Sequence, residues 1–195
     1  MGISRGINLT IFLITLILTV GFFRKDGEWK FERFRKALRY FTFLSNAFCA
    51  LGSLCMFIAP EYTACWILKY ISTVAVTVTM LTVFLFLAPT FKTLTGLLKG
   101  SELFMHLLTP LMAIISLCVF ERHPLSFPLA ITGVIPVLLY GAWYLYQIMY
   151  APKEKRWEDF YGFNRGGKWP VAFAAMMIAT FLICMGYMAI MRMPA

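Results

Sequence analysis

The chain has 195 residues, of which 61% are hydrophobic and 14% are charged, and its formal net charge is +9. A soluble domain of this length cannot bury so much apolar surface, since small folds leave a large share of their surface exposed to water. The composition therefore excludes an ordinary soluble domain and predicts a membrane protein.

Six apolar runs are each long enough to cross about 30 Å of hydrocarbon, which takes roughly 20 helical residues. They are continuously apolar rather than alternating, which favours helices over the strands of a barrel. The connections between them are too short to form a core of their own. The sequence therefore predicts a single all-α domain over residues 1–195, a polytopic bundle of six transmembrane helices. We expect these helices at residues 7–23, 40–59, 64–89, 103–120, 125–150 and 169–191.

Most of the positive charge lies in the connections at one end of the predicted bundle. Fourteen of the eighteen Lys and Arg residues, Lys92 among them, fall in the connections after the first, third and fifth helices. The opposite end carries only Arg5, Arg122 and Arg192. By the positive-inside rule the basic connections face the cytoplasm and both termini, including Ala195, lie outside. This distribution of charge argues against a nucleic-acid partner.

The connection after the first helix contains the segment EWKFERFRKAL at residues 28–38. It places Trp29, Phe31, Phe34 and Leu38 among basic residues, a pattern typical of a helix that lies on an anionic leaflet. A solvated basic loop is the alternative, because helical spacing over so few residues is weak support.

Two polar residues near the starts of apolar helices have matching depths. Thr42 lies three residues beyond Arg39, and His106 lies four residues beyond Glu102. At 1.5 Å per residue, each is about 5–6 Å inside its helix, at the same end of the bundle. The two side chains can therefore meet if the second and fourth helices are neighbours. A structural histidine that bonds a neighbouring helix is the alternative for His106.

A threonine paired with a histidine has a defined chemistry. The hydroxyl is a poor nucleophile until a base takes its proton, and neutral histidine is the usual base near neutral pH. Asn46 lies one turn after Thr42 on the same face, where it could donate to an oxyanion or position a substrate carbonyl. Taken alone, Thr42 would be a helix-packing residue, because threonines readily bond their own helix.

The fifth helix adds a possible pocket wall. Tyr140, Tyr144 and Gln147 follow an i, i+4, i+7 pattern on one face. An interfacial aromatic belt explains some of the aromatic residues here, but Tyr140 lies about three turns inside the helix. We therefore predict that these three residues contact a substrate.

The remaining polar residues favour no other chemistry. We expect Lys69, five residues from the start of the third helix, to reach water by snorkelling. We expect no acidic residue deep in the bundle, which weakens an ion-transport function. The five cysteines lack a metal-binding spacing, so neither a metal nor another cofactor is predicted.

Three sequence features resemble one family. They are a threonine opening the second helix in YFTFLSN, a histidine in HLLTP at the start of the fourth, and an aromatic stretch ending the fifth. Together they resemble the androgen-induced and androgen-dependent six-helix membrane hydrolases, which act on esters of fatty acids with hydroxy fatty acids. Several bacterial membrane proteins look similar, which implies a bacterial inner membrane for this chain.

The resemblance implies that Thr42 is the nucleophile and His106 its base, the pair that the depth argument also reaches. We therefore expect a threonine hydrolase of lipid esters that needs no cofactor. The alternative is a non-catalytic protein that binds lipid or transports a small solute. The sequence predicts no oligomeric state.

Overall fold

The computed structural model describes residues 2–25, 27–91, 96 and 98–193. Lys92 and Ala195, which entered the charge argument, lie outside the described residues. The chain divides into two compact units, Met1–Pro124 and Leu125–Ala195. Each is described by itself below, and the prediction of a single domain stays a prediction.

The prediction of an all-α protein with six apolar helices is confirmed. Each helix is long and apolar enough to cross a membrane, and the observed bounds differ from the predicted ones by a few residues. The six spans are Gly2–Phe23, Phe41–Ile58, Thr63–Leu87, Ser101–Phe120, Phe127–Met149 and Trp169–Arg192.

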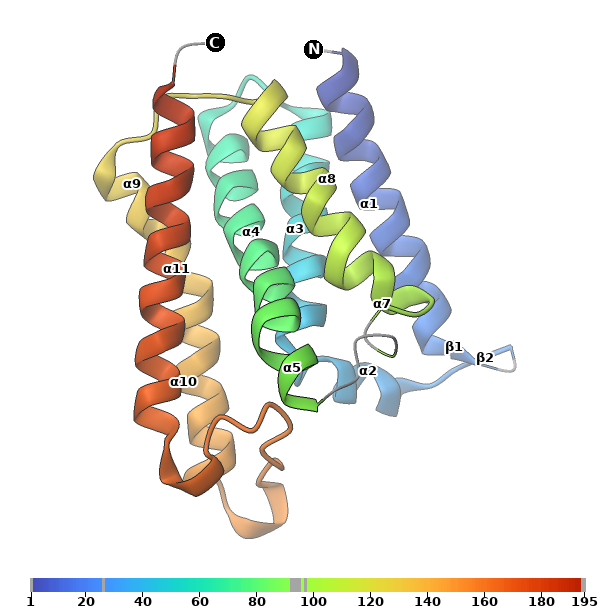
Figure 1. The fold of residues 1–195 in the computed structure, drawn as a ribbon. Helices are drawn as coiled ribbons and strands as arrows, with labels where there is room; N and C mark the ends of the chain where they lie inside the picture. The colour runs from blue at the N-terminus through green and yellow to red at the C-terminus, as the bar shows by residue number, and fades with distance from the viewer. Residues whose placement is uncertain (1, 26, 92–95, 97, 194–195) are drawn as a thin grey trace. The chain divides into compact units, whose positions relative to one another are not determined.

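The first unit contains four of these spans, which lie side by side (Figure 1). They are α1 (Gly2–Phe23), α3 (Phe41–Ile58), α4 (Thr63–Thr82) continued by η1 (Val83–Leu87) and α5 (Ala88–Phe91), and a fourth span in four parts. The parts are α7 (Ser101–Leu103), η2 (Phe104–Leu108), α8 (Thr109–Ile115) and η3 (Ser116–Phe120). Each of the four helices contributes one fully buried residue to the middle of the unit: Ile11, Cys49, Val76 and Ala113.

Two of the spans contain a π-helical turn just before a proline. The turn η1 ends two residues before Pro89, and η2 ends two residues before Pro110. Proline has no N–H, and its ring clashes with the carbonyl four residues earlier in an α-helix. A wider turn moves that carbonyl away from the ring, so these π-helical turns let both spans continue past a proline.

The helices α3 and α4 approach closely at Gly52. A Cβ atom at this position would lie 2.6 Å from Ser72 Oγ and 3.2 Å from both the Leu68 carbonyl oxygen and Lys69 Cα. Only glycine leaves room for this contact, which is how small residues bring membrane helices together.

The connection between α1 and α3 has secondary structure of its own. A two-stranded hairpin of β1 (Arg24–Lys25) and β2 (Glu28–Trp29) is followed by the short helix α2 (Phe31–Ala37). Gly27, in the turn, has a φ of 79°, which suits a residue without a side chain. The helix predicted within residues 28–38 is confirmed, and the hairpin before it was not predicted.

The second unit consists of two spans and the loop between them. The first span comprises α9 (Phe127–Ile131), η4 (Thr132–Val134) and α10 (Ile135–Met149), and the second is α11 (Trp169–Arg192). The loop carries two short 3₁₀ turns, η5 (Lys153–Lys155) and η6 (Arg165–Gly167). Asp159 organises this loop, because its carboxylate accepts hydrogen bonds from the N–H groups of Phe163 and Asn164.

Candidate active site

The predicted nucleophile and base lie in neighbouring helices of the first unit. Thr42 is in the first turn of α3, which begins at Phe41, and it is half-buried. His106 lies in the π-helical turn η2 and is buried. The proline that accounts for this turn, Pro110, is four residues after His106 and cannot donate a hydrogen bond to the His106 carbonyl.

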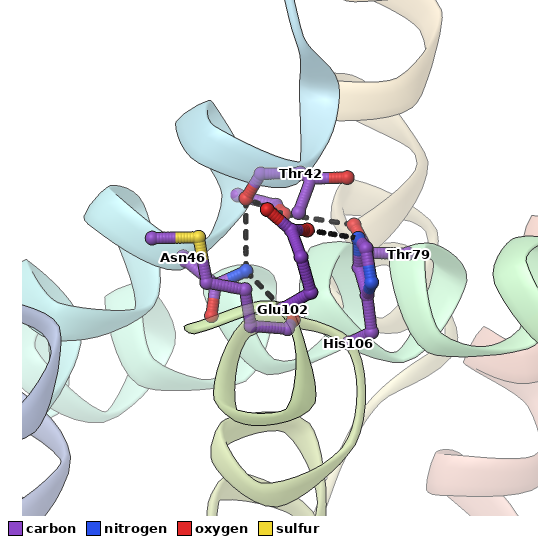
Figure 2. A network of polar contacts seen from close by, with 7 residues as sticks. Thr42, Asn46, Thr79, Glu102 and His106 are labelled. Atoms are coloured by element: carbon purple, nitrogen blue, oxygen red, sulfur yellow. Dashed lines mark hydrogen bonds and ion pairs between the residues drawn. The ribbon is translucent and has the colours of Figure 1, made fainter. Parts of the chain in front are cut away.

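Asn46 joins the two helices at this level. Its Nδ2 atom donates to the Thr42 carbonyl oxygen at 2.8 Å and to the Met105 carbonyl oxygen at 3.0 Å, as Figure 2 shows. Met105 is the residue before His106, so this one amide connects the turn that carries Thr42 with the turn that carries His106. The condition for the predicted pair, that the second and fourth spans are neighbours, is therefore met.

His106 has an acidic partner that the sequence analysis did not assign. Its Nε2 atom lies 3.4 Å from Glu102 Oε2, one helical turn earlier. The His106 side chain is 6% exposed and that of Glu102 is 45% exposed, so the carboxylate reaches from the surface to a buried imidazole. The i, i+4 spacing of the two residues was the signal that could have found this pair.

Thr42 enters the network through its backbone. Its carbonyl oxygen accepts a hydrogen bond from Asn46 and another from Ser45 Oγ at 3.2 Å. Ser45 Oγ also lies 2.8 Å from Thr79 Oγ1 in α4, so three helices meet here. Figure 2 shows Thr42 and His106 in one cluster. A direct hydrogen bond between the Thr42 hydroxyl and the imidazole stays a prediction.

The geometry of Asn46 limits what it can offer a substrate. Both of its N–H donors are directed at backbone carbonyls. Its Oδ1 atom is buried and has no hydrogen-bond partner in the described part of the chain. In this arrangement donation to an oxyanion would require Asn46 to release a carbonyl.

The other three predicted substrate contacts lie in the second unit, in α10. Tyr140 and Tyr144 stack with ring centroids 6.0 Å apart. The Tyr144 hydroxyl donates to Asp159 Oδ1 at 2.7 Å and accepts a hydrogen bond from the Tyr161 N–H at 3.2 Å. The Gln147 carbonyl accepts the N–H of Trp157 at 3.1 Å. These contacts hold the loop against its own helix, and substrate binding by the three residues stays a prediction.

One expectation about a charged residue in the first unit is wrong. Lys69 does not reach water, because it is fully buried and its Nζ atom donates to Ser53 Oγ at 2.8 Å. Glu121 is also buried, but it directly follows Phe120, the last residue of its span, and so lies toward one end of the unit. Helix packing through Gly52 places Ser53 beside Lys69, and an available hydroxyl replaces the contact with water that snorkelling would provide.

Glu121 is the centre of a second buried polar cluster. Its Oε1 atom accepts hydrogen bonds from Ser4 Oγ at 2.7 Å, from Ser116 Oγ at 2.8 Å and from Asn8 Nδ2. Its carbonyl oxygen accepts the indole N–H of Trp66 at 2.6 Å. Ser4 and Asn8 lie in the N-terminal part of α1, far along the helices from the turns that carry Thr42 and His106. The first unit therefore has a buried polar cluster toward each end.

Among the residues that the structure describes, no three His, Cys, Asp or Glu side chains lie close enough together to hold a metal ion. Comparison of the chain with family models, curated proteins and solved structures found no match. The likeness to the six-helix hydrolases thus rests on the residues named above.

Proposed function

We propose that this protein is an integral membrane hydrolase that cleaves lipid esters, with Thr42 as nucleophile and His106 as base. The observation that carries the proposal is the position of His106, which is buried and lies beside the Glu102 carboxylate. The carbonyl of the preceding residue, Met105, accepts a hydrogen bond from Asn46, which also bonds the carbonyl of Thr42. A hydroxyl, an imidazole and a carboxylate are the three groups that recur in acyl-transfer enzymes on unrelated folds.

Glu102 has a specific part in this proposal. When neutral His106 shares its Nε2 proton with Glu102, the basic nitrogen of the ring is Nδ1. The carboxylate also stabilises the imidazolium that forms when His106 takes a proton. The 3.4 Å separation is longer than an ordinary hydrogen bond, as is common for catalytic contacts in the absence of substrate.

The reaction follows from these roles. Thr42 Oγ1 attacks the ester carbonyl carbon while its proton passes to His106. The carbon–oxygen bond to the alcohol breaks, and the departing oxygen takes the proton from His106. Water then gives a proton to His106 and attacks the acyl-threonine, and the returning proton restores the Thr42 hydroxyl as the fatty acid leaves.

The substrate class follows from the location of the site. Thr42 is the second residue of its span and His106 the sixth, so both lie near the end of the bundle, where the ester groups of lipids meet the headgroups. A lipid ester can reach this depth laterally from the bilayer. The excess of basic residues at this end supports a site that opens toward the cytoplasmic leaflet. The inner membrane of a bacterium is proposed from the likeness to bacterial membrane proteins alone.

The test is covalent labelling together with hydrolysis. Purified protein in detergent is treated with a long-chain fluorophosphonate, and the labelled peptide is identified by mass spectrometry. We expect the label on Thr42, and we expect Thr42→Ala and His106→Ala to lose ester hydrolysis almost equally, because the two residues act as one unit.

Thr10→Ala is the matched control, because Thr10 is an exposed threonine of the same unit whose hydroxyl bonds the Gly6 carbonyl of its own helix. This variant should label and hydrolyse normally. Labelling of a different residue, or hydrolysis that survives Thr42→Ala, would overturn the proposal.

A non-catalytic protein that binds lipid or transports a small solute is the second candidate. The observation that favours it is the burial of two ionisable side chains, Lys69 within its span and Glu121 just after the end of its span, because buried ionisable residues of membrane proteins commonly mark solute pathways. Uptake into vesicles that is lost in Glu121→Gln, with no hydrolysis by the unaltered chain, would support this function instead.

A further inference from the structure

The connection between α1 and α3 must lie at the membrane boundary. Both helices are apolar spans, and they are joined by residues 24–40. Figure 1 shows the hairpin of β1 and β2 projecting away from the end of α1, with α2 following it. This segment is therefore placed where lipid headgroups meet water.

One face of the segment is held against the bundle. The Phe34 ring contacts Phe23 of α1 and Phe43 of α3, with centroids 5.0 Å and 6.4 Å apart. Ala37, three residues further along α2, is buried. Arg33 donates to the Phe22 carbonyl oxygen at 3.2 Å. These contacts fix the orientation of α2, so its other face is held in a defined direction.

The hairpin and the side of α2 next to Phe34 expose large apolar side chains, and the Phe31 ring lies 5.9 Å from that of Phe34. Trp29 is 66% exposed and Phe31 is 71% exposed. Along α2, Phe31 is followed at i+4 by Arg35 and at i+7 by Leu38, which is also exposed, so an apolar stripe contains a cation. Such a face is costly in water alone and suits an interface with an apolar interior and an anionic surface.

The charge of the segment matches an anionic surface. Residues 24–40 contain seven basic and three acidic residues, a net charge of +4. Arg24 pairs with Trp29 across the hairpin, so a cation lies opposite the exposed indole. Arg35 and Lys36 are exposed on α2. Cations are therefore interleaved with both exposed aromatic side chains.

We propose that the hairpin and the outward face of α2 bind anionic phospholipids of the adjacent leaflet, with Trp29 and Phe31 inserted between headgroups and Arg24, Arg35 and Lys36 on the phosphates. This headgroup site is independent of any chemistry at Thr42. It would concentrate anionic lipid beside the first unit, whether the protein is an enzyme or a carrier.

The test uses the full chain in phosphatidylcholine nanodiscs that contain a small fraction of brominated lipid. Bromine on the upper acyl chain quenches tryptophan fluorescence at short range. The share of the fluorescence that comes from Trp29 is the part of the signal that is lost in the Trp29→Phe variant. We expect brominated phosphatidylglycerol to quench this share several times more strongly than brominated phosphatidylcholine at the same mole fraction.

The charge variant is Arg24→Gln, Arg35→Gln and Lys36→Gln combined. The preference for phosphatidylglycerol should fall by about fivefold for each cation lost near the anionic surface, until both lipids quench alike. It should also weaken at high salt.

The control variant, Lys153→Gln, Lys155→Gln and Lys168→Gln, removes the same charge from the loop of the second unit and should leave the preference intact. Equal quenching of Trp29 by both lipids in the unaltered chain, or an unchanged preference in the charge variant, would overturn the inference.

Discussion

The side-chain amide of Asn46 donates a hydrogen bond to the carbonyl oxygen of Met105, 59 residues further along the chain, while the same nitrogen bonds the Thr42 carbonyl. This side chain connects two spans that are distant in sequence. It does so at the level where Thr42 and His106 lie, so the relative position of the two proposed catalytic residues depends on it.

We predict that Asn46→Ala lowers the free energy of unfolding by about 1–3 kcal/mol, because the Met105 carbonyl loses the hydrogen bond from Asn46 and the Thr42 carbonyl keeps only the one from Ser45 Oγ. Asn46→Asp should destabilise more than the alanine variant, since a carboxylate of the same shape would face both carbonyls without a proton to donate. The free energies of unfolding of both variants are measured in mixed micelles that contain an increasing share of a denaturing detergent. If Asn46→Asp is as stable as the unaltered chain, the donor role is wrong.

A second prediction concerns Glu102 as a positioning residue. Glu102→Gln should lower kcat for ester hydrolysis by about 10–100-fold while leaving KM and stability nearly unchanged, because it removes only the charge that supports the imidazolium. Glu102→Asp should restore part of the loss. Glu61→Gln, which alters an exposed acidic residue of the same unit, is the control and should be fully active. Full activity of Glu102→Gln would show that the contact with His106 is incidental.

Lys69 and Ser53 should behave as a coupled pair. Ser53→Ala removes the acceptor from a buried ammonium and should cost about 1.5–3 kcal/mol of stability, the range for hydrogen bonds to charged groups. Adding Lys69→Met should recover part of this cost, since no charge is then left without its acceptor. A double-mutant cycle measures the coupling, and strictly additive effects would contradict it.

The close approach of α3 and α4 gives a steric prediction. Gly52→Ala should destabilise the first unit by about 1–3 kcal/mol, because its Cβ would overlap Ser72 Oγ and crowd the α4 backbone. Adding Ser72→Ala should relieve the overlap only in part. Gly21→Ala, in α1, is the control, because a Cβ there meets nothing within 4 Å. A neutral Gly52→Ala would mean that the helices can separate at little cost.

The orientation of the chain is testable with reporter fusions. Reporters placed after Lys30 and after Lys155 should be active on the cytoplasmic side, and a reporter at the C-terminus should be active outside, as the distribution of basic residues predicts. A cytoplasmic C-terminus would overturn the orientation derived from charge.

The spans could be predicted because a helix that crosses the bilayer needs a long, continuous apolar run, and such a run is visible in the sequence. The amphipathic pattern of residues 28–38 likewise predicted α2, although the membrane contact of that segment stays a prediction. The hairpin before α2 was missed, even though Asp26–Gly27 between short polar segments is a known turn signal.

Side-chain environments were harder to predict, because they depend on which helices are neighbours. Lys69 was expected to reach water, and only the packing at Gly52 reveals that Ser53 lies within its reach. Glu102 was read as a marker of the helix start, so its contact with His106 was overlooked despite the favourable spacing. Residue counts could place Thr42 and His106 at the same end of the bundle, whereas neither their depth relative to the observed helix starts nor the direction of the Thr42 hydroxyl could be derived in this way.

The π-helical turn at Phe104–Leu108 makes the site dependent on the number of residues in one short segment. Such a turn holds about one residue more than an α-helical turn, so removing one residue there would restore ordinary winding and rotate everything on its N-terminal side by about 100°. Glu102 would then turn away from the bundle while Pro110 and the helix after it kept their places. A single-codon deletion in this segment would also bring the Pro110 ring back toward the carbonyl four residues earlier, so we expect it to disturb both the span and the site more than most substitutions do.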